Sequence, residues 1–255
     1  MRPSYEELAK MIDHALLHPT MTDEQMEAGC QAAIKYGVAS VCIKPYYVRR
    51  AAQLLQGSDV LVGTVIGFPH GSNLTEIKRQ ETQLACQDGA AEIDMVINVG
   101  KAISGDWQYV QQDIEAVCNE AHKHGAKVKV IIENDYLASG GGGLDGDALK
   151  SKLCQISEAA GADWVKTSTG FGFVKQSGGG YNYQGATEHD LKLMREAVSE
   201  SVQVKASGGV RDLEGLLRVR ELGASRCGTS ATAQILDAYG RDESIGSGKL
   251  GGGGY

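Results

Sequence analysis

A short sequence motif, called the phrase below, recurs along the chain: a glycine, a small residue and then a run of apolar, strand-forming residues. Each copy follows a segment in which apolar residues recur with helical spacing. Glycine is the expected stop of such a helix because it adopts the left-handed conformation at little cost. The phrase therefore predicts a chain that alternates helix and strand. Its copies are Gly37-Val38-Ala39-Ser40-Val41, Gly89-Ala90-Ala91-Glu92-Ile93, Gly125-Ala126-Lys127-Val128, Gly161-Ala162-Asp163-Trp164-Val165 and Gly223-Ala224-Ser225-Arg226-Cys227.

The segments between these glycines predict eight strands and eight helices. Two of the helices start with sequences that resemble capping boxes, Thr22 to Gln25 and Asn73 to Glu76, and Thr187 resembles a related start. The strands are expected near residues 11–16, 39–44, 60–67, 92–98, 127–133, 163–169, 202–207 and 226–229. The helices are expected near residues 22–36, 46–55, 73–88, 107–123, 145–160, 187–199, 212–222 and 230–239.

Strict alternation of strand and helix predicts a parallel sheet. Eight such units in 255 residues fit an α/β protein with one domain, a closed (β/α)8 TIM barrel over residues 1–240. Residues 241–255 are expected to form a flexible, glycine-rich tail that ends in Tyr255. The alternative is an open, doubly wound sheet. No GxGxxG motif follows the first strand, which weakens a dinucleotide-binding interpretation.

Charge and cysteine usage narrow the function classes. The net charge is −7 and no basic run is present, which disfavours nucleic acid as a partner. No apolar run is long enough to cross a bilayer, and no signal peptide is apparent at the start. The six cysteines are scattered without CxxC spacing, which favours reduced thiols in a cytoplasmic protein over disulfides or a zinc site.

Two lysines each lie in an apolar strand pattern that runs into a turn of small residues: Lys166 and Lys205. Burial of an ammonium ion is costly, so a lysine at such a position is unusual. Two of them at neighbouring strand ends are expected to lower each other's pKa, and a neutral lysine is a carbonyl nucleophile. The alternative is that each side chain extends to solvent at a strand end.

Side chains alternate between the two faces of a strand, and the apolar face should contact the helices. The polar face then lines the barrel, where branched apolar residues are usual. Several strands would contribute charged groups of both signs to this interior. A purely structural ion-pair network is one interpretation, and a catalytic site is favoured because the charges are desolvated together. The ionisable residues predicted to point inward are Asp13, Lys44, Asp94, Lys129, Glu133, Lys166 and Lys205.

Three small, glycine-containing loops follow successive strands. They are Ser168-Thr169-Gly170, Ser207-Gly208-Gly209-Val210-Arg211 and Gly228-Thr229-Ser230. Loops after the seventh and eighth strands of barrels commonly bind phosphate, because backbone N–H groups and a helix start approach the anion there. Arg211 either adds positive charge or is an ordinary surface residue.

An amine nucleophile, a second lysine, a carboxylate and a phosphate cradle suit Schiff-base aldol chemistry. Lys166 or Lys205 would attack a carbonyl, and Asp94 with the other lysine would move the proton. This chemistry needs no cofactor and no metal, and no His, Asp or Glu set has metal-ligand spacing.

The two lysine motifs, together with Glu92-Ile93-Asp94-Met95-Val96-Ile97-Asn98, Ile12-Asp13-His14-Ala15-Leu16-Leu17 and Ser40-Val41-Cys42-Ile43-Lys44-Pro45, resemble deoxyribose-phosphate aldolase. The resemblance covers nearly the whole chain. It implies a (β/α)8 class I aldolase that reversibly cleaves 2-deoxy-D-ribose 5-phosphate, a small phosphorylated substrate, to acetaldehyde and D-glyceraldehyde 3-phosphate. It also implies a homodimer.

The resemblance implies roles for individual residues. Lys166 would form the Schiff base, and Lys205 would perturb its pKa and join Asp94 in proton transfer. The substrate would be contacted by Asp13, Cys42 and Thr169. The phosphate would be held by Gly170, Gly208, Gly209, Gly228 and Ser230. The tail would carry Tyr255 to the site to assist proton transfer, the alternative being an idle tyrosine.

The sequence departs from the family pattern at Lys44, where many members carry an uncharged residue, and at Glu133-Asn134-Asp135-Tyr136. Gly140 to Gly143 and Gly178 to Gly180 resemble extra loop material near the rim, which could alter the acceptor pocket. Two alternatives therefore stand beside the expected activity. One is a Schiff-base aldolase or transaldolase for another sugar phosphate, and the other is a sugar-phosphate-binding barrel without catalysis.

Overall fold

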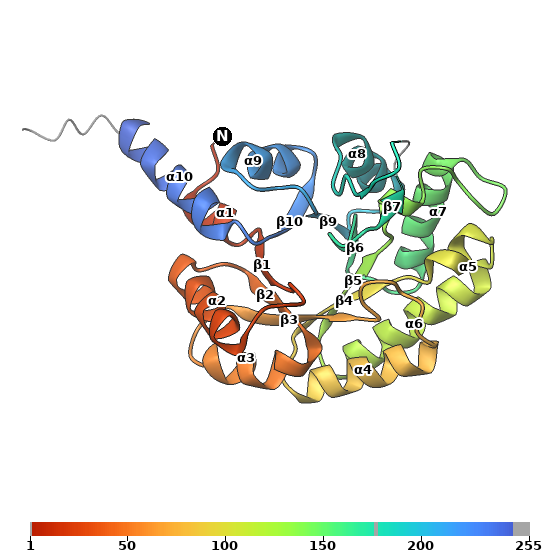
Figure 1. Cartoon of the computed structure of the whole chain (residues 1–255), viewed down its shortest axis with the longest axis horizontal. Coiled ribbons are helices and arrows are strands. Elements are labelled where there is room, and N and C mark those ends of the chain that lie inside the picture. The colour runs from red at the N-terminus through yellow and green to blue at the C-terminus, as the bar shows by residue number, and fades with distance from the viewer. Residues whose placement is uncertain (1, 176–177, 247–255) are drawn as a thin grey trace, which may run out of the picture.

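The computed structural model describes residues 2–175 and 178–246. Eight parallel strands close into a barrel in the order β1-β10-β9-β6-β5-β4-β3-β2, and helices surround it (Figure 1). The predicted (β/α)8 barrel is thus confirmed, and the open sheet is excluded because β1 pairs with both β2 and β10. The barrel strands are β1 (Ile12–Leu16), β2 (Ser40–Ile43), β3 (Leu61–Ile66), β4 (Glu92–Val96), β5 (Lys127–Ile131), β6 (Trp164–Lys166), β9 (Gln203–Ser207) and β10 (Ala224–Thr229).

The helices follow the strands as predicted, with two short additions, α1 and α5. The helices are α1 (Tyr5–Ala9), α2 (Asp23–Tyr36), α3 (Val48–Leu54), α4 (Thr75–Gln87), α5 (Val99–Ile103), α6 (Trp107–Lys123), α7 (Gly146–Ala159), α8 (Glu188–Ala197), α9 (Leu213–Glu221) and α10 (Thr232–Gly246), with the 3-10 turns η1 (Pro45–Tyr47) and η2 (Asn134–Tyr136). Helix α10 continues into the segment expected to be a tail. Tyr255 lies outside the described residues. No helix in the described ranges is both long and apolar enough to cross a membrane.

The helix boundaries show which sequence signals were reliable. Gly37 ends α2 with φ 63°, and the capping box of Thr22 and Gln25 is present. Thr187 caps α8 by accepting from the Asp190 N–H. The predicted box at Asn73 is wrong: Leu74 is the N-cap of α4 and no side chain caps this end. The Glu76 carboxylate instead accepts hydrogen bonds from Arg79 and Gln80.

Strand alternation separates an apolar layer from a polar interior. Ile93 and Met95 of β4, with Val204 and Ala206 of β9, belong to the apolar core. The intervening residues of β4 and β9 face the inside of the barrel, where the charged side chains meet. The assignment of faces from period-two alternation is therefore confirmed for these strands, and it positions the functional groups.

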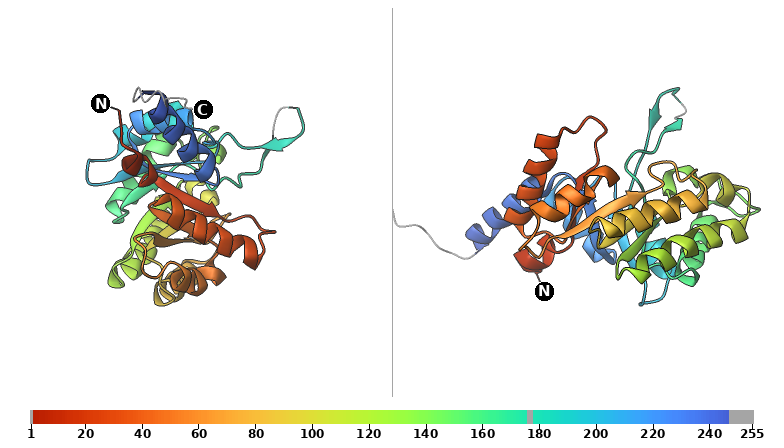
Figure 2. Two further views of the ribbon diagram at one scale, coloured as in Figure 1. Left: turned by 90° about the vertical axis from the view of Figure 1, so that its left-hand side faces the viewer. Right: turned by 90° about the horizontal axis from the view of Figure 1, so that it is seen from below.

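The two glycine-rich insertions differ in structure. Around Gly178 to Gly180 the chain forms an antiparallel hairpin of β7 (Val174–Lys175) and β8 (Tyr181–Asn182), which projects away from the barrel (Figure 2). Around Gly140 to Gly143 the chain forms a tight turn against α5, where the Gly142 N–H donates to the Ile103 carbonyl at 2.7 Å. A side chain on Gly142 would collide with Trp107, which explains glycine at that position.

A buried ion pair between α4 and α6 yields a stability prediction. Lys78 Nζ lies 2.5 Å from Asp113 Oδ2, and both side chains are fully buried. Lys78 also donates to the Val96 carbonyl at 2.9 Å. Asp113→Ala would leave the ammonium ion buried without its carboxylate, so we expect the free energy of unfolding to fall by about 3–5 kcal/mol in urea titrations.

The matched control is Glu27→Gln, which breaks the half-exposed pair of Glu27 with Arg50. That pair is screened by water, so its loss should cost less than about 1 kcal/mol. Equal effects of Asp113→Ala and Glu27→Gln would contradict the assignment of Lys78 and Asp113 as a desolvated pair.

Candidate active site

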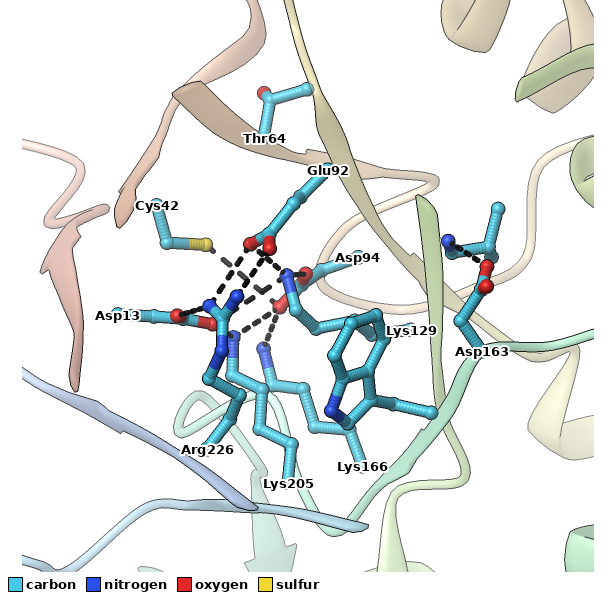
Figure 3. A network of polar contacts seen from close by, with 12 residues as sticks. Asp13, Cys42, Thr64, Glu92, Asp94, Lys129, Asp163, Lys166, Lys205 and Arg226 are labelled. Carbon is cyan, nitrogen blue, oxygen red and sulfur yellow. Dashed lines mark hydrogen bonds and ion pairs between the residues drawn. The ribbon is translucent and has the colours of Figure 1, made fainter. Parts of the chain in front are cut away.

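The interior of the barrel holds a set of ion-paired side chains that we call the charged cluster. Figure 3 shows them converging inside the barrel, and they come from β1, β4, β5, β6, β9 and β10. All are nearly fully buried except that the side chain of the arginine is 13 % exposed. The members of the charged cluster are Asp13, Glu92, Asp94, Lys129, Lys166, Lys205 and Arg226.

Asp94 lies at the centre of this cluster. Its Oδ2 accepts hydrogen bonds from Lys166 Nζ and Lys205 Nζ, each at 2.7 Å, and its Oδ1 accepts from Lys129 Nζ at 3.0 Å. The strand register produces this arrangement, because Lys166 is paired with Lys205 across β6 and β9, and Asp94 with Lys129 across β4 and β5. Three amines thus share one carboxylate.

A second layer of the charged cluster lies beneath Asp94. Asp13 contacts Lys205 Nζ at 2.5 Å, and it also binds Arg226. Glu92 accepts from both Lys129 and Arg226, each at 2.6 Å. Arg226 therefore joins Asp13 to Glu92 across the barrel.

The sequence prediction missed Arg226 and Glu92 as members of the cluster. Glu92 has the same parity as Asp94 on β4, so strand alternation could have found it. Arg226 has the same parity as Gly228, opposite the core residue Cys227, but the alternation before it is interrupted because the register of β10 against β9 shifts between Ala224 and Arg226. Such a bulge re-aims a side chain and breaks the simple alternation.

Two predicted inward charges lie elsewhere. Lys44 follows the end of β2, and its Nζ donates to the carbonyls of His18 and Met21 at 3.1 and 3.3 Å. It is not part of the charged cluster, so that prediction was wrong. Glu133 is buried beside the cluster, where its carboxylate accepts from the Thr169 N–H at 3.2 Å. Burial raises the pKa of Glu133.

The formal charges of the cluster do not balance. Four cationic groups, Lys129, Lys166, Lys205 and Arg226, face three carboxylates. A buried excess charge is costly, so a cluster with one neutral amine is favoured. Lys166 has the fewest partners, because it contacts only one carboxylate of the cluster, Asp94.

The electrostatic environment separates the two lysines. Burial lowers the pKa of Lys166, and the charge of Lys205 adds to this effect against the opposing influence of Asp94. Burial would also lower the pKa of Lys205, but Asp13 and Asp94 raise it well above the ordinary value. The expectation that the lysines lower each other's pKa was therefore wrong for Lys205, which has two carboxylate partners.

The same balance of burial and neighbouring charge sets the pKa values of Asp94 and Cys42. Burial would raise the pKa of Asp94, but the three lysines outweigh this and hold it well below the usual value. Burial raises the pKa of the Cys42 thiol to about 11, so this group is a neutral neighbour of Asp94 at 3.9 Å. No group of three or more His, Cys, Asp or Glu side chains in residues 2–175 and 178–246 could hold a metal ion.

A cavity of about 470 Å³ opens above the charged cluster, at the carboxyl ends of the strands. Lys166 and Lys205 line it, whereas Asp94 and Asp13 lie beneath its wall. Most of the other predicted site residues line the same cavity: Cys42, Thr169, Gly170, Gly208, Gly209, Gly228 and Ser230. Cavity-lining residues that were not predicted as site residues include Phe171, Tyr183 and Ser207.

The glycines around this cavity have specific conformations. Gly170, Gly208 and Gly209 have φ of 81°, 90° and 89°, a region that disfavours other residues. A methyl group on Gly228 would lie 3.0 Å from Ser207 Oγ and 3.4 Å from Lys205 Cε, so glycine leaves room for the Ser207 side chain. Arg211 also lines the cavity, and it forms no ion pair with any residue that the structure describes.

This fold and site define a class of protein: a (β/α)8 barrel with buried lysine amines beneath a cavity at the carboxyl ends of its strands, which is where enzymes of this fold carry their active sites. A match to the DeoC/LacD family of aldolases spans residues 8–243. The chain is 50 % identical to the deoxyribose-phosphate aldolase of Rhodopirellula baltica, over 91 % of this chain and 89 % of that protein.

Solved structures agree with this match. A structure described as "QR15, an Aldolase" has a TM-score of 0.82 at 33 % identity and covers 93 % of this chain and 98 % of its own. The tetrameric deoxyribose phosphate aldolase of Aeropyrum pernix has a TM-score of 0.80 at 30 % identity, over 93 % and 92 % of the two chains. The chain belongs to the DeoC/LacD family of aldolases, which confirms the family expected from the lysine motifs.

The charge imbalance predicts how the pKa of Lys166 responds to its neighbour. Lys205→Met leaves three cations and three carboxylates, so Lys166 becomes the charged partner of Asp94 and its pKa rises. We expect competitive acetylation of Lys166 by acetic anhydride, followed by mass spectrometry, to need a higher pH in this variant than in the wild type.

Lys175→Met serves as the control because Lys175 is an exposed lysine of the hairpin. It should leave the pH dependence of Lys166 acetylation unchanged. An unchanged or lower pKa of Lys166 in Lys205→Met would refute the charge balance described above.

Proposed function

We propose that the chain is a class I aldolase that reversibly cleaves 2-deoxy-D-ribose 5-phosphate to acetaldehyde and D-glyceraldehyde 3-phosphate. The reaction proceeds through a Schiff base on Lys166. The observation that carries the proposal is the position of this lysine: it lines the cavity, and its Nζ shares Asp94 Oδ2 with Lys205. Burial and the charge of Lys205 both lower its pKa, which supplies the neutral amine that attack requires.

In the cleavage direction, Lys166 Nζ attacks the C1 carbonyl of the open-chain sugar, and loss of water gives an iminium ion. The C3 hydroxyl then loses its proton and becomes an aldehyde carbonyl while the C2–C3 bond breaks. The electron pair of that bond passes to C2, and the iminium becomes an enamine. Protonation of the enamine at C2 and addition of water release acetaldehyde and restore the amine.

Proton transfer is assigned to the groups next to Lys166. Asp94 Oδ2 accepts hydrogen bonds from both Lys166 and Lys205 at 2.7 Å, so we assign Asp94 the role of relaying a proton between the two amines. Lys205 stays charged, because Asp13 and Asp94 raise its pKa, and we assign its ammonium the role of holding Asp94 in position and lowering the pKa of Lys166. Tyr255 remains a predicted further participant, and it lies outside the described residues.

Substrate contacts are assigned to the cavity wall. Cys42 and Thr169 line the cavity and remain proposed substrate contacts. Asp13 does not line it, so we assign Asp13 the role of holding Lys205 rather than of touching the substrate. The phosphate is placed at the backbone N–H groups of Gly170, Gly208, Gly209, Gly228 and Ser230, with Arg211 as the nearby cation.

A homodimer and a cytoplasmic location are also proposed. The cysteines are all free thiols, which supports a reducing compartment. The relative from Aeropyrum pernix is described as tetrameric. Sedimentation of the purified protein would decide between these assemblies.

Borohydride trapping tests the Schiff base. We expect the protein incubated with acetaldehyde and sodium borohydride to carry an N-ethyl group on Lys166, located by peptide mass spectrometry. Lys166→Arg should abolish both the adduct and the cleavage of 2-deoxy-D-ribose 5-phosphate, since a guanidinium stays protonated. Lys129→Arg is a useful comparison, because it changes another lysine of the same cluster that should never be trapped.

Absence of an adduct on Lys166 would overturn the mechanism. Trapping on Lys166 without turnover of 2-deoxy-D-ribose 5-phosphate would instead preserve the chemistry and reassign the substrate to another sugar phosphate.

Gly208 yields a test of the phosphate position. Its φ of 90° disfavours alanine, and an added methyl group would lie 2.9 Å from Gly185 Cα. The turn would have to shift, so we expect Gly208→Ala to raise KM for 2-deoxy-D-ribose 5-phosphate by roughly 10-fold or more, the value of one lost hydrogen bond to a charged phosphate. Trapping with acetaldehyde should persist, because acetaldehyde carries no phosphate.

Gly178→Ala is the control for this substitution, because an added methyl group at Gly178 meets nothing within 4 Å. Its kinetics should match the wild type. A wild-type KM in Gly208→Ala would show that the turn at Gly208 does not hold the phosphate.

A further inference from the structure

We propose that Tyr183, at the base of the β7–β8 hairpin, determines specificity for the phosphorylated end of the substrate. Its phenol hydroxyl donates a hydrogen bond to the substrate phosphate. This inference rests on the proposed function, because it places the phosphate at the turns around Gly208. It assigns the projecting hairpin a role in the site.

The hairpin is fixed to the barrel at both of its legs. On the first leg, the Phe173 N–H donates to the Tyr136 hydroxyl at 2.7 Å. On the second leg, the Asp135 carboxylate accepts from the N–H groups of Gln184 and Gly185 at 2.5 and 3.1 Å. Tyr136 and Asp135 both belong to η2, in the loop after β5. Tyr183 is therefore held in place by the barrel itself rather than by the exposed tip.

The second leg also packs on the turn proposed to hold phosphate. The Ala186 N–H donates to the Gly208 carbonyl at 3.1 Å. A methyl group on Gly208 would lie 3.5 Å from Tyr183 Cε2, and one on Gly172 would lie 3.2 Å from Tyr183 Cβ. The tyrosine thus packs against the positions of two glycines, and its ring lies beside Gly208.

Tyr183 lines the same cavity as Lys166, Gly170 and Gly208, and its side chain is half-buried there. Its hydroxyl makes no hydrogen bond with any residue in the described ranges. A tyrosine hydroxyl that is buried normally finds a partner, and a substrate in the cavity would cover this one. Arg211, which lines the cavity as well, also has no ion-pair partner among the described residues. A phosphate dianion is the part of the substrate that can satisfy both groups.

The test compares a phosphorylated and an unphosphorylated substrate. For Tyr183→Phe we expect KM for 2-deoxy-D-ribose 5-phosphate to rise roughly 10-fold, the value of one hydrogen bond to a charged group, with kcat nearly unchanged. The kcat/KM for unphosphorylated 2-deoxy-D-ribose should stay at the wild-type value. Trapping of acetaldehyde on Lys166 should also be unaffected, which shows that the variant is folded and its amine is active.

Tyr181→Phe is the matched control. Tyr181 lies on the same hairpin, where it is 52 % exposed and stacks on Phe173 with 4.2 Å between ring centroids. It does not line the cavity. This variant should behave as the wild type on both substrates.

Two results would overturn the proposal for Tyr183. One is an equal fall in kcat/KM for both substrates, which would mean that the tyrosine shapes the cavity without recognising phosphate. The other is an unchanged KM and kcat for both substrates. If the wild type shows trapping but no preference for the phosphorylated sugar, the phosphate assignment itself fails, whereas a wild type without trapping on Lys166 would refute the proposed function instead.

Discussion

The structure depends on the sharing of one buried carboxylate by three amines. Asp94 accepts from Lys129, Lys166 and Lys205, and water has little access to any of them. In such surroundings charges must nearly balance, because an unpaired buried ion costs far more than the hydrogen bonds return. Lys205 contacts a second carboxylate, Asp13, which keeps its amine charged. Lys166 is therefore the amine that is expected to lose its proton. In the proposed mechanism, the reactivity of Lys166 is therefore a consequence of how the neighbouring ions are paired.

The barrel makes this pairing possible. Parallel register places Lys166 beside Lys205 and Asp94 beside Lys129, while the apolar alternate residues contact the surrounding core. Loops at the carboxyl ends of the strands then supply the cavity above the cluster. The hairpin after β6 adds a wall to this cavity through Tyr183, and hydrogen bonds to η2 hold that wall in place.

Much of this could be predicted from the sequence, because the signals are local. Glycine helix stops and the strand and helix patterns between them indicated the eight units, and strand parity brought Lys166, Lys205 and Asp94 together. Arg226 was not assigned a face, since a register shift precedes it, and parity failed for Lys44, which lies beyond the end of its strand. The hairpin was expected only as loop material, since its strands are two residues each and depend on tertiary anchors. Identifying the lysine with the lower pKa required the three-dimensional structure, which shows the amines that each carboxylate contacts.

The central claim is that Lys166 is the neutral amine of the charged cluster. NMR of protein labelled with ¹³C at lysine Cε, titrated with pH and assigned with a Lys166→Met variant, measures this directly. The account predicts that the Lys166 resonance reaches its neutral position at a pH below the ordinary lysine pKa of about 10.4, while Lys205 remains charged throughout. A Lys166 that stays protonated up to that pH, or a Lys205 that loses its proton first, would contradict the account.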